Sequence, residues 1–289
     1  MDLNKLDHLV AVAEEGGFTP AAKRLHLSQQ ALSSSVRALE REVGVQLLDR
    51  GGNAITVLPA AQALITDARV LRGVAHSAMQ RARRIGRGES ETLRIGHAPS
   101  ITGNEITELL RRVRAAHPDL GTQVHQRYPS ELVDHLLSGD LDIGLCRGMS
   151  PGRGLVRSTL THHRLRVAVA AEHHLAGRER VRLPELADEP IVVWGHPGRS
   201  GYTDLLVQHC REAGFEPRIR RNPVQGTPPV TAVIGTDHAA FVTASPGPAA
   251  DGQVRVVELD PPVHVPLHAL WPQHISSEAR DAFLADCGD

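Results

Sequence analysis

The chain contains 289 residues, with 32 Lys and Arg, 33 Asp and Glu, and a formal net charge of -1. Because a domain usually takes roughly 100–200 residues, this length predicts two domains. Hydrophobic residues make up 41% and charged residues 22%, which excludes wholesale disorder, a collagen-like fibre and a strongly basic histone-like protein. Aromatic residues make up only 3%, so we expect aliphatic cores.

The cysteines, Cys146, Cys210 and Cys287, are far apart and form no CxxC pair. This spacing predicts neither a disulfide framework nor a cysteine metal site, and it favours a reducing cytoplasm. No switch by an intramolecular disulfide is expected at Cys210. The first residues have no signal-peptide core, and no apolar run approaches the ~20 residues that a membrane helix needs. We therefore expect a cytoplasmic protein without a membrane segment.

The first sixty residues have the spacing of three compact helices. Gly16 and Gly17 are expected to end the first helix, and Thr19, followed by proline, to cap the second. Ser28 is expected to cap a third helix, which runs to about residue 43 and has a polar outer face. The buried stripe predicted for that helix consists of Leu32, Val36, Leu39 and Val43. This is the helix-turn-helix pattern, and residues 49–57 follow it as a hairpin, or wing.

A longer helical stretch follows from about residue 59 to residue 87. Its apolar residues alternate steps of three and four for more than three heptads, which predicts a coiled-coil seam. A helix of about 27 residues at ~1.5 Å per residue would span ~40 Å, which is long for packing inside one small domain. We therefore favour dimerisation over a core helix. The dimerisation contacts predicted from the spacing are Leu64, Ala68, Leu71, Ala75 and Ala78.

From residue 93 onward, short strands alternate with helices, which predicts a parallel α/β sheet in two lobes. The strands are expected at residues 93–96, 122–126, 141–146, 165–170, 191–194, 218–221, 239–243 and 267–270. A helix is expected near residues 229–234. Open parallel sheets bind ligands at the carboxyl ends of their strands, so we expect a ligand in the cleft between the lobes.

The fold class expected for the whole chain is α/β, with a mainly helical N-terminal part. The expected domains are a winged helix-turn-helix at residues 1–58, a linker helix and hinge at 59–91, and a two-lobed ligand-binding domain at 92–289. Lobe I is expected at about 92–160 plus 268–289, and lobe II at about 161–267.

Residues 18–33 read FTPAAKRLHLSQQALS and match the F-T-x-A-A-x-x-L-x-x-S-Q-x-A-L-S pattern of LysR-type transcriptional regulators. Residues 39–50 resemble the stretch that follows it, and weaker similarity covers nearly the whole chain. The resemblance implies a winged helix-turn-helix, a dimerising linker helix and a two-lobed domain like a periplasmic solute-binding protein. It also implies homodimers or homotetramers on promoter DNA, RNA polymerase as a partner of an activator, and a small-molecule effector.

Two positions on the expected DNA face depart from the family pattern. Gln30 stands where proline is usual, and Ser34 where a basic or larger polar residue is usual, which affects base preference more than fold. Glutamine can form paired hydrogen bonds to adenine, and arginine can reach guanine or a phosphate. The expected DNA contacts are Thr19, Ser28, Gln29, Gln30, Ser33, Ser34, Arg37, Arg50 and Asn53. Any one of them could instead be an ordinary surface residue, but the set favours DNA binding.

In the C-terminal part, hydroxyl groups and two arginines lie where strands are expected to end and helices to begin. Backbone N–H groups at a helix start bind anions, and hydroxyl groups add further donors. The expected effector contacts are Ser100, Ile101, Thr102, Ser130, Arg147, Ser200 and Thr227. This set predicts a small ligand that carries a carboxylate. Helix capping remains an alternative for each Ser or Thr, and a surface ion pair for Arg147.

The sequence offers little for an enzyme. The GRSG segment at residues 198–201 is not a nucleophile elbow, and no HExxH, P-loop or dinucleotide fingerprint is present. We expect no catalytic residues, cofactor or metal. His162-His163 and His173-His174 would point to opposite faces of a strand, so exposed histidines are expected there. Two other classes stay open: a small-molecule binding protein whose N-terminal helices serve only assembly, and a hydrolase or transferase.

Overall fold

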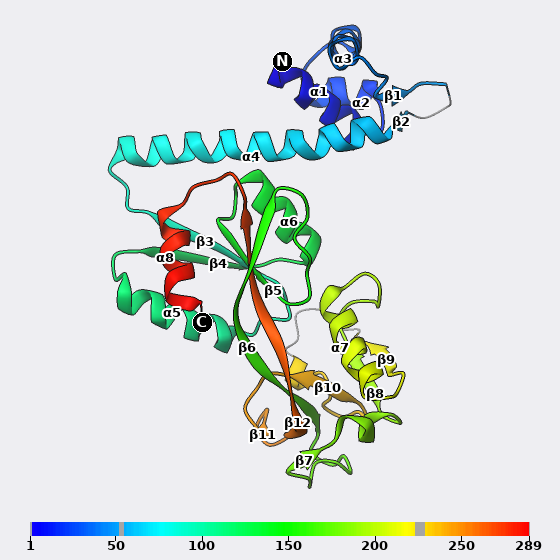
Figure 1. Ribbon diagram of the computed structural model, residues 1–289, viewed down its shortest axis with the longest axis vertical. Coiled ribbons are helices and arrows are strands. Elements are labelled where there is room, and N and C mark those ends of the chain that lie inside the picture. The colour runs from blue at the N-terminus through cyan, green and yellow to red at the C-terminus, as the bar shows by residue number, and fades with distance from the viewer. Residues whose placement is uncertain (1, 52–54, 223–228, 289) are drawn as a thin grey trace. The chain divides into compact units, whose positions relative to one another are not determined.

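A computed structural model describes residues 2–51, 55–222 and 229–288 of the chain (Figure 1). The chain divides into two compact units, Met1–Arg83 with Leu137–Gly139 and Arg84–Leu136 with Asp140–Asp289. Each unit has its own hydrophobic core. Among the described helices, none combines the length and apolar character that spanning a membrane would require.

The N-terminal fold consists of three short helices and a two-stranded hairpin. These elements are α1 (Leu3–Glu14), α2 (Phe18–Arg24), α3 (Gln29–Val43), β1 (Leu48–Asp49) and β2 (Thr56–Val57). The two strands pair antiparallel, which confirms the predicted wing. Leu32, Val36 and Leu39 on α3 pack with Leu6 and Leu9 on α1 in a wholly aliphatic buried core. The stripe along α3 therefore fixes which face of this helix remains in water.

Local capping explains most of the helix ends. Gly16, with φ of +67°, follows α1, and Gly44, with φ of +81°, caps α3, since the left-handed conformation favours glycine. The Ser28 hydroxyl accepts a hydrogen bond from the Ala31 N–H at 3.1 Å, as predicted. The prediction for α2 is wrong, because the N-cap is Gly17 rather than Thr19. The helix begins at Phe18, two residues before the predicted start at Pro20. Thr19 therefore lies inside the first turn of α2.

The long helix α4 (Pro59–Arg87) begins by completing the N-terminal core. Ala61, Ile65 and Ala68 are buried there, and Leu64 packs against them. Ala68 is only 2% exposed within the single chain, so its assignment to a dimer seam is corrected. Leu71, 41% exposed, is the first residue of the predicted seam that remains open to a partner. Val43, predicted at the end of the α3 stripe, is also exposed.

The second unit contains a ten-stranded mixed sheet in the order β4-β3-β5-β12-β6-β10-β8-β9, with β7 and β11 added to β12. Its strands are β3 (Thr92–His97), β4 (Gly121–Gln126), β5 (Ile143–Cys146), β6 (Leu155–Ala170), β7 (Arg180–Val181), β8 (Pro190–Val193), β9 (Arg218–Arg221), β10 (Ala239–Val242), β11 (Gly247–Ala249) and β12 (Val254–Pro272). Strands β3, β4 and β5 are parallel, and so are β8, β9 and β10. Each lobe thus keeps the predicted parallel pattern.

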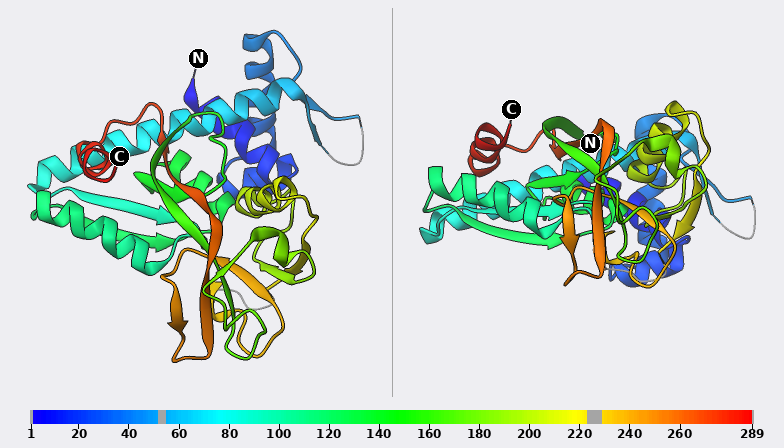
Figure 2. Two further views of the ribbon diagram at one scale, coloured as in Figure 1. Left: turned by 60° about the horizontal axis from the view of Figure 1, so that its bottom comes forward. Right: turned by 90° about the horizontal axis from the view of Figure 1, so that it is seen from below.

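The central pair β6–β12 is antiparallel and runs through both lobes (Figures 1 and 2). Leu160 and Leu267 belong to the core of the first lobe, whereas Leu165 and Val265 belong to that of the second. The prediction of a parallel sheet with short strands at 165–170 and 267–270 is therefore wrong for this central pair. Between the two cores β6 carries the polar residues 161–164, and the apolar pattern that marks a buried strand is missing there.

Helices cover the sheet of the second unit. They are α5 (Gly103–Ala116), α6 (Pro129–Ser138), α7 (Gly201–Glu212), α8 (Glu278–Cys287) and the 3₁₀ turns η1 (Leu183–Leu186) and η2 (Pro229–Thr231). Helix α8 packs on α5 through the core of the first lobe. A helix was predicted near residues 229–234, but only the short turn η2 forms there. The backbone hydrogen bonds recorded in this segment span three residues, as in a 3₁₀ turn, and not the four of an α-helix. Cys210 on α7 is buried, and burial raises the pKa of its thiol to about 12.

Candidate functional sites

The exposed face of α3 presents the predicted polar residues. Gln29, Gln30, Ser34 and Arg37 are exposed, and Ser33 is half-buried at the edge of the core. The turn before α3 is tight, because the Leu27 N–H bonds to the Ala22 carbonyl at 2.9 Å. Helix α3 therefore follows α2 with its core side fixed and its polar side free, which is the geometry of a recognition helix.

Two side chains next to this face have contacts within the chain. The Thr19 hydroxyl donates to Gln29 Oε1 at 3.3 Å, which orients the Gln29 amide and leaves its NH₂ group for another partner. Ser28 serves as the helix cap. Both residues thus support the recognition face from within the chain, and direct contact of either one with DNA stays a prediction.

Arg50, predicted to contact DNA from the wing, is held inside the N-terminal unit. Its guanidinium pairs with Glu40 at 3.1 Å and lies 5.0 Å from the centre of the Phe18 ring. Glu40 also accepts hydrogen bonds from the N–H groups of Leu47 and Leu48 at 3.0 and 3.2 Å. Arg50 therefore fastens the wing to α3. Asn53, the other predicted wing contact, lies outside the described residues.

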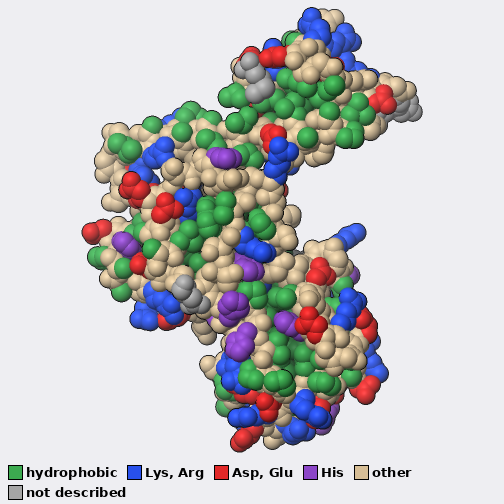
Figure 3. All heavy atoms as spheres, in the orientation of Figure 1, with side chains coloured by type: hydrophobic (Ala, Val, Ile, Leu, Met, Phe, Trp, Pro, Cys, Tyr) green, Lys and Arg blue, Asp and Glu red, His purple; other side chains and the backbone are tan. Residues whose placement is uncertain are grey.

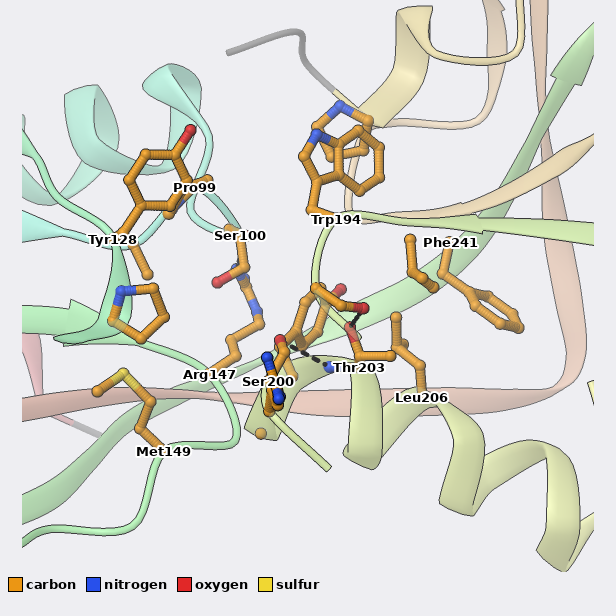
Figure 4. A pocket seen from close by; sticks show the side chains of 18 of the residues that line it. Pro99, Ser100, Tyr128, Arg147, Met149, Trp194, Ser200, Thr203, Leu206 and Phe241 are labelled. Atoms are coloured by element: carbon orange, nitrogen blue, oxygen red, sulfur yellow. Dashed lines mark hydrogen bonds between the residues drawn. The ribbon is translucent and has the colours of Figure 1, made fainter. Parts of the chain in front are cut away.

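A pocket opens between the two lobes of the second unit (Figure 4). It has a volume of about 150 Å³. Its lining comes from the ends of β3, β5 and β8 and from the start of α7, as predicted for the carboxyl ends of parallel strands. The lining residues are Ala98, Pro99, Ser100, Tyr128, Pro129, Arg147, Met149, Val192, Val193, Trp194, Gly195, Arg199, Ser200, Gly201, Tyr202, Thr203, Leu206, Pro229 and Phe241. These residues are mostly apolar, with polar groups concentrated near α7.

Three of the predicted effector contacts, Ser100, Arg147 and Ser200, line this pocket. The other described ones do not, and the predicted set is corrected accordingly. Ile101 is buried in the core of the first lobe. Thr102 caps α5 in a capping box with Glu105. Ser130 is exposed on the first turn of α6, and Thr227 lies outside the described residues.

Arg147 is fully buried at the pocket and is not the surface ion pair that the sequence left open. It donates to the Ser100 carbonyl and, at 2.6 Å, to Glu105. His163 Nδ1 also lies 2.6 Å from Glu105 and its side chain is 26% exposed, so the prediction of an exposed His163 is wrong. Arg147 Nε is buried without a hydrogen-bond partner among the described residues.

Glu105 balances the buried arginine charge. Burial alone would raise the pKa of its carboxyl, but the hydrogen bond from His163 and the charge of Arg147 outweigh it and hold the pKa far below its ordinary value. Glu105 is therefore ionised at neutral pH. His163 Nδ1 also lies 2.7 Å from Arg147 Nη2, so this ring nitrogen contacts both members of the buried ion pair.

Four aromatic residues at the pocket were not predicted as contacts: Tyr128, Trp194, Tyr202 and Phe241. The whole chain contains only eight aromatic residues, two Trp, two Tyr and four Phe. Half of them thus gather at one cavity, although they come from separate segments. The small number of aromatic residues was visible in the sequence and could have marked them as candidate contacts. That four of them meet at one pocket depends on the fold.

Two glycines bring the backbones of the lobes together beside the pocket. Gly148, with φ of +66°, follows β5, and Gly201 begins α7. A Cβ atom on Gly201 would overlap the Gly148 carbonyl, and a Cβ atom on Gly148 would overlap the Gly201 carbonyl. Only glycine at both positions permits this approach.

Comparison with known proteins identifies the family of both parts of the chain. Residues 3–62 match the bacterial regulatory helix-turn-helix protein, lysR family, and residues 86–288 match the LysR substrate binding domain. The chain is 34% identical over 210 residues to the uncharacterized HTH-type transcriptional regulator YnfL of Escherichia coli (strain K12), covering 71% of this chain and 70% of the relative. It is 30% identical to the HTH-type transcriptional regulator AlsR of Bacillus subtilis (strain 168), covering 94% and 89%.

The fold is also that of solved LysR proteins. The crystal structure of full-length CbnR complexed with its target DNA gives a TM-score of 0.64 at 24% identity, over 99% of each chain. At this identity the likeness shows the fold alone, and the sequence matches carry the assignment. The chain belongs to the LysR family of bacterial helix-turn-helix regulators, and it is a DNA-binding transcriptional regulator rather than an enzyme.

Proposed function

We propose that this regulator binds a small anionic effector with a planar apolar part in the pocket between its lobes, and that occupancy tunes its action on promoter DNA. The observation that carries the proposal is the charge of the lining. It contains Arg147 and Arg199 but, among the described residues, no Asp or Glu. Glu105 offsets Arg147 from behind the lining, so Arg199 leaves a positive charge at the pocket.

The start of α7 supports the anionic end of such a ligand. Ser200, Gly201 and Tyr202 line the pocket where this helix begins. The N-terminus of a helix presents backbone N–H groups and a partial positive charge. Arg147, whose Nε has no hydrogen-bond partner among the described residues, lines the same pocket. The other wall, with Trp194, Phe241 and Val192, suits a flat apolar group.

The size of the pocket limits the ligand. An apolar cavity of about 150 Å³ can hold benzene, and the volume here is about 150 Å³. Aromatic side chains stack on unsaturated rings at centroid distances of about 4.5–7 Å. A monocyclic aromatic carboxylate therefore satisfies both the charge and the volume better than a sugar or a nucleotide.

Calorimetry with matched acids and amides tests this proposal. Benzoate and benzamide have nearly the same shape and differ in charge, and an aliphatic carboxylate tests the apolar wall. We expect the acid to bind at least tenfold more tightly than the amide, and Arg199→Gln to weaken the acid alone. No measurable heat with any carboxylate, or equal affinity for acid and amide, would contradict an anion site. Arg111→Gln, on the exposed face of α5, is the matched control.

For the DNA, we propose that α3 enters the major groove and reads bases through Gln29, Gln30 and Arg37. Ser33 and Ser34 would contact the phosphate backbone of the DNA. Residues 1–91 contain 12 Lys and Arg against 10 Asp and Glu, so unspecific attraction to phosphates is weak. Useful affinity then depends on a homodimer or homotetramer that presents several recognition helices together, and an activator would in addition engage RNA polymerase. Acidic and basic side chains are interspersed over the visible face of the second unit (Figure 3).

Footprinting on the DNA upstream of the gene tests these contacts. We expect Gln29→Ala and Arg37→Ala each to abolish the specific footprint while the melting curve stays that of the parent. Both side chains are exposed, so their loss leaves the core intact. Arg111→Ala, in the other unit, is expected to leave the footprint unchanged. Unchanged footprints in both α3 variants would contradict the assignment.

A further inference from the structure

A second polar cluster lies in lobe II, in the connection between β6 and β7. Strand β6 ends at Ala170, and successive turns follow, in which the His173 N–H bonds to the Ala170 carbonyl at 3.0 Å and the Ala176 N–H to the His173 carbonyl at 2.8 Å. His173 and His174 are therefore not in a strand, and their rings stack with centroids 4.5 Å apart. The prediction that they point to opposite faces is wrong.

Both imidazoles converge on one carboxylate. Nε2 of His173 lies 3.2 Å from Oε2 of Glu189, and Nε2 of His174 lies 3.3 Å from Oε1. Glu189 directly precedes β8, and its N–H bonds to the Leu186 carbonyl at 3.1 Å, so the sheet fixes its position. One ligand atom from each of the three side chains lies within 4.8 Å of the others.

The three side chains differ in exposure in a useful way. His173 is 4% exposed and Glu189 13%, whereas His174 is 67% exposed. Two of the groups are thus held by the protein, and the third opens the cluster to solvent. Within the described part of the chain, the recorded ion-pair partners of Glu189 are these two histidines. Its negative charge is therefore available to a cation.

We propose that His173, His174 and Glu189 form a binding site for a divalent transition-metal ion of the zinc type. Two imidazole nitrogens and a carboxylate are a donor set that Zn²⁺ takes with bonds of about 2.0–2.1 Å. Tetrahedral bonds of that length place neighbouring ligand atoms about 3.3 Å apart. Each imidazole nitrogen already lies at about this distance from one oxygen of the Glu189 carboxylate, 3.2 Å from Oε2 for His173 and 3.3 Å from Oε1 for His174. Ca²⁺ and Mg²⁺ prefer oxygen ligands alone and are disfavoured.

One hydrogen bond lowers the affinity that we expect. The Leu175 N–H donates to His173 Nδ1 at 3.2 Å, which places the proton of the uncharged ring on Nε2, where it donates to Glu189. A metal ion at Nε2 requires the other tautomer, with the proton on Nδ1. The ring must then turn from the Leu175 N–H, which takes water as its acceptor. Because this rearrangement costs free energy, we expect weaker binding than at a site whose ligands already have the required tautomer.

Metal titration of the full-length protein tests the site. After treatment with a chelator, Zn²⁺ is titrated by calorimetry and Co²⁺ by its visible absorption, which reports tetrahedral nitrogen and oxygen coordination. We expect one saturable site per chain and a higher melting temperature with Zn²⁺. His174→Ala and Glu189→Gln are each expected to weaken binding at least tenfold. His174 is exposed, so its replacement leaves the fold intact.

The chain contains 17 histidines, so a control for unspecific binding is required. His264→Ala removes an exposed histidine outside the cluster and is expected to leave the affinity and the stoichiometry unchanged. Absence of a saturable site overturns the proposal. Unchanged binding in both cluster variants, or an equal loss in His264→Ala, overturns it as well.

Discussion

Replacing Glu105 by Gln tests the buried charges at the pocket most directly. Glu105 compensates Arg147, which has no exposed side-chain surface, and accepts from His163 and from the Thr102 N–H at 2.8 Å. Glutamine keeps the size and one acceptor oxygen, but it removes the negative charge and puts an NH₂ donor in place of the other acceptor oxygen. The substitution thus leaves the Arg147 charge buried and uncompensated.

The expected loss follows from the cost of an unpaired buried charge. Removing one partner of a buried ion pair costs about 3–5 kcal/mol, and because glutamine keeps part of the hydrogen bonding, we expect ~3 kcal/mol. For a unit of this size, ~3 kcal/mol corresponds to a melting temperature lower by roughly 6–12 °C. The loss belongs to the second unit, since Glu105, Arg147 and His163 all lie within it.

Calorimetric melting as a function of pH provides the assay. The folded pKa of Glu105 lies far below its ordinary value of 4.5, so its contribution to stability is complete well above pH 4.5 and is lost as the pH falls below that value. The difference between parent and Glu105→Gln should therefore be constant from about pH 6 upward and shrink below 4.5. Glu108→Gln, which removes an exposed carboxylate on the same helix, should not change the melting temperature. A Glu105→Gln protein that melts within 2 °C of the parent at pH 7 would refute the reasoning.

Three further predictions concern other parts of the chain. Leu32→Ala empties a fully buried position on α3 and should destabilise the N-terminal unit by about 2–5 kcal/mol in denaturant unfolding; a loss below 1 kcal/mol would contradict its place in the core. Leu71→Asp puts a charge on the exposed face of α4 and should shift the protein toward monomer in sedimentation, whereas an unchanged oligomer would exclude a seam through Leu71. Gly201→Ala should force the lobes apart at the Gly148 carbonyl and weaken effector binding at least tenfold, with α7 intact by circular dichroism; full affinity would show that this contact does not control the pocket.

Sequence patterns predicted the helices of the N-terminal unit well, because these helices depend on the spacing and capping of residues that are close together in the chain. The spacing of Leu32, Val36 and Leu39 fixes one face of α3, and Ser28 and Gly44 mark its ends. The exposed position of Gln29 then follows from helical geometry alone. The same reasoning failed for Ala68, since an alanine on a coiled-coil pattern can equally face the core of its own chain.

The pocket was predicted only in outline. Helix starts and strand ends indicated Ser100, Arg147 and Ser200, but local pattern could not separate a lining hydroxyl from the capping hydroxyl of Thr102. The role of Glu105 was invisible, because its partner Arg147 lies 42 residues away in the sequence. The aromatic lining likewise comes from segments that are distant along the chain.

The sequence by itself determined that the cores are aliphatic, because its composition contains few aromatic residues. Its local periodicities determined the helix-turn-helix and the alternation of strands and helices. Periodicity reports only which residues share a face of one element. The tertiary structure alone decided that β6 and β12 run antiparallel through both lobes, that Glu105 neutralises Arg147, and that His173 and His174 turn toward Glu189. Those contacts join residues far apart in the chain, and they exist only where packing of the whole fold brings the groups within hydrogen-bond distance.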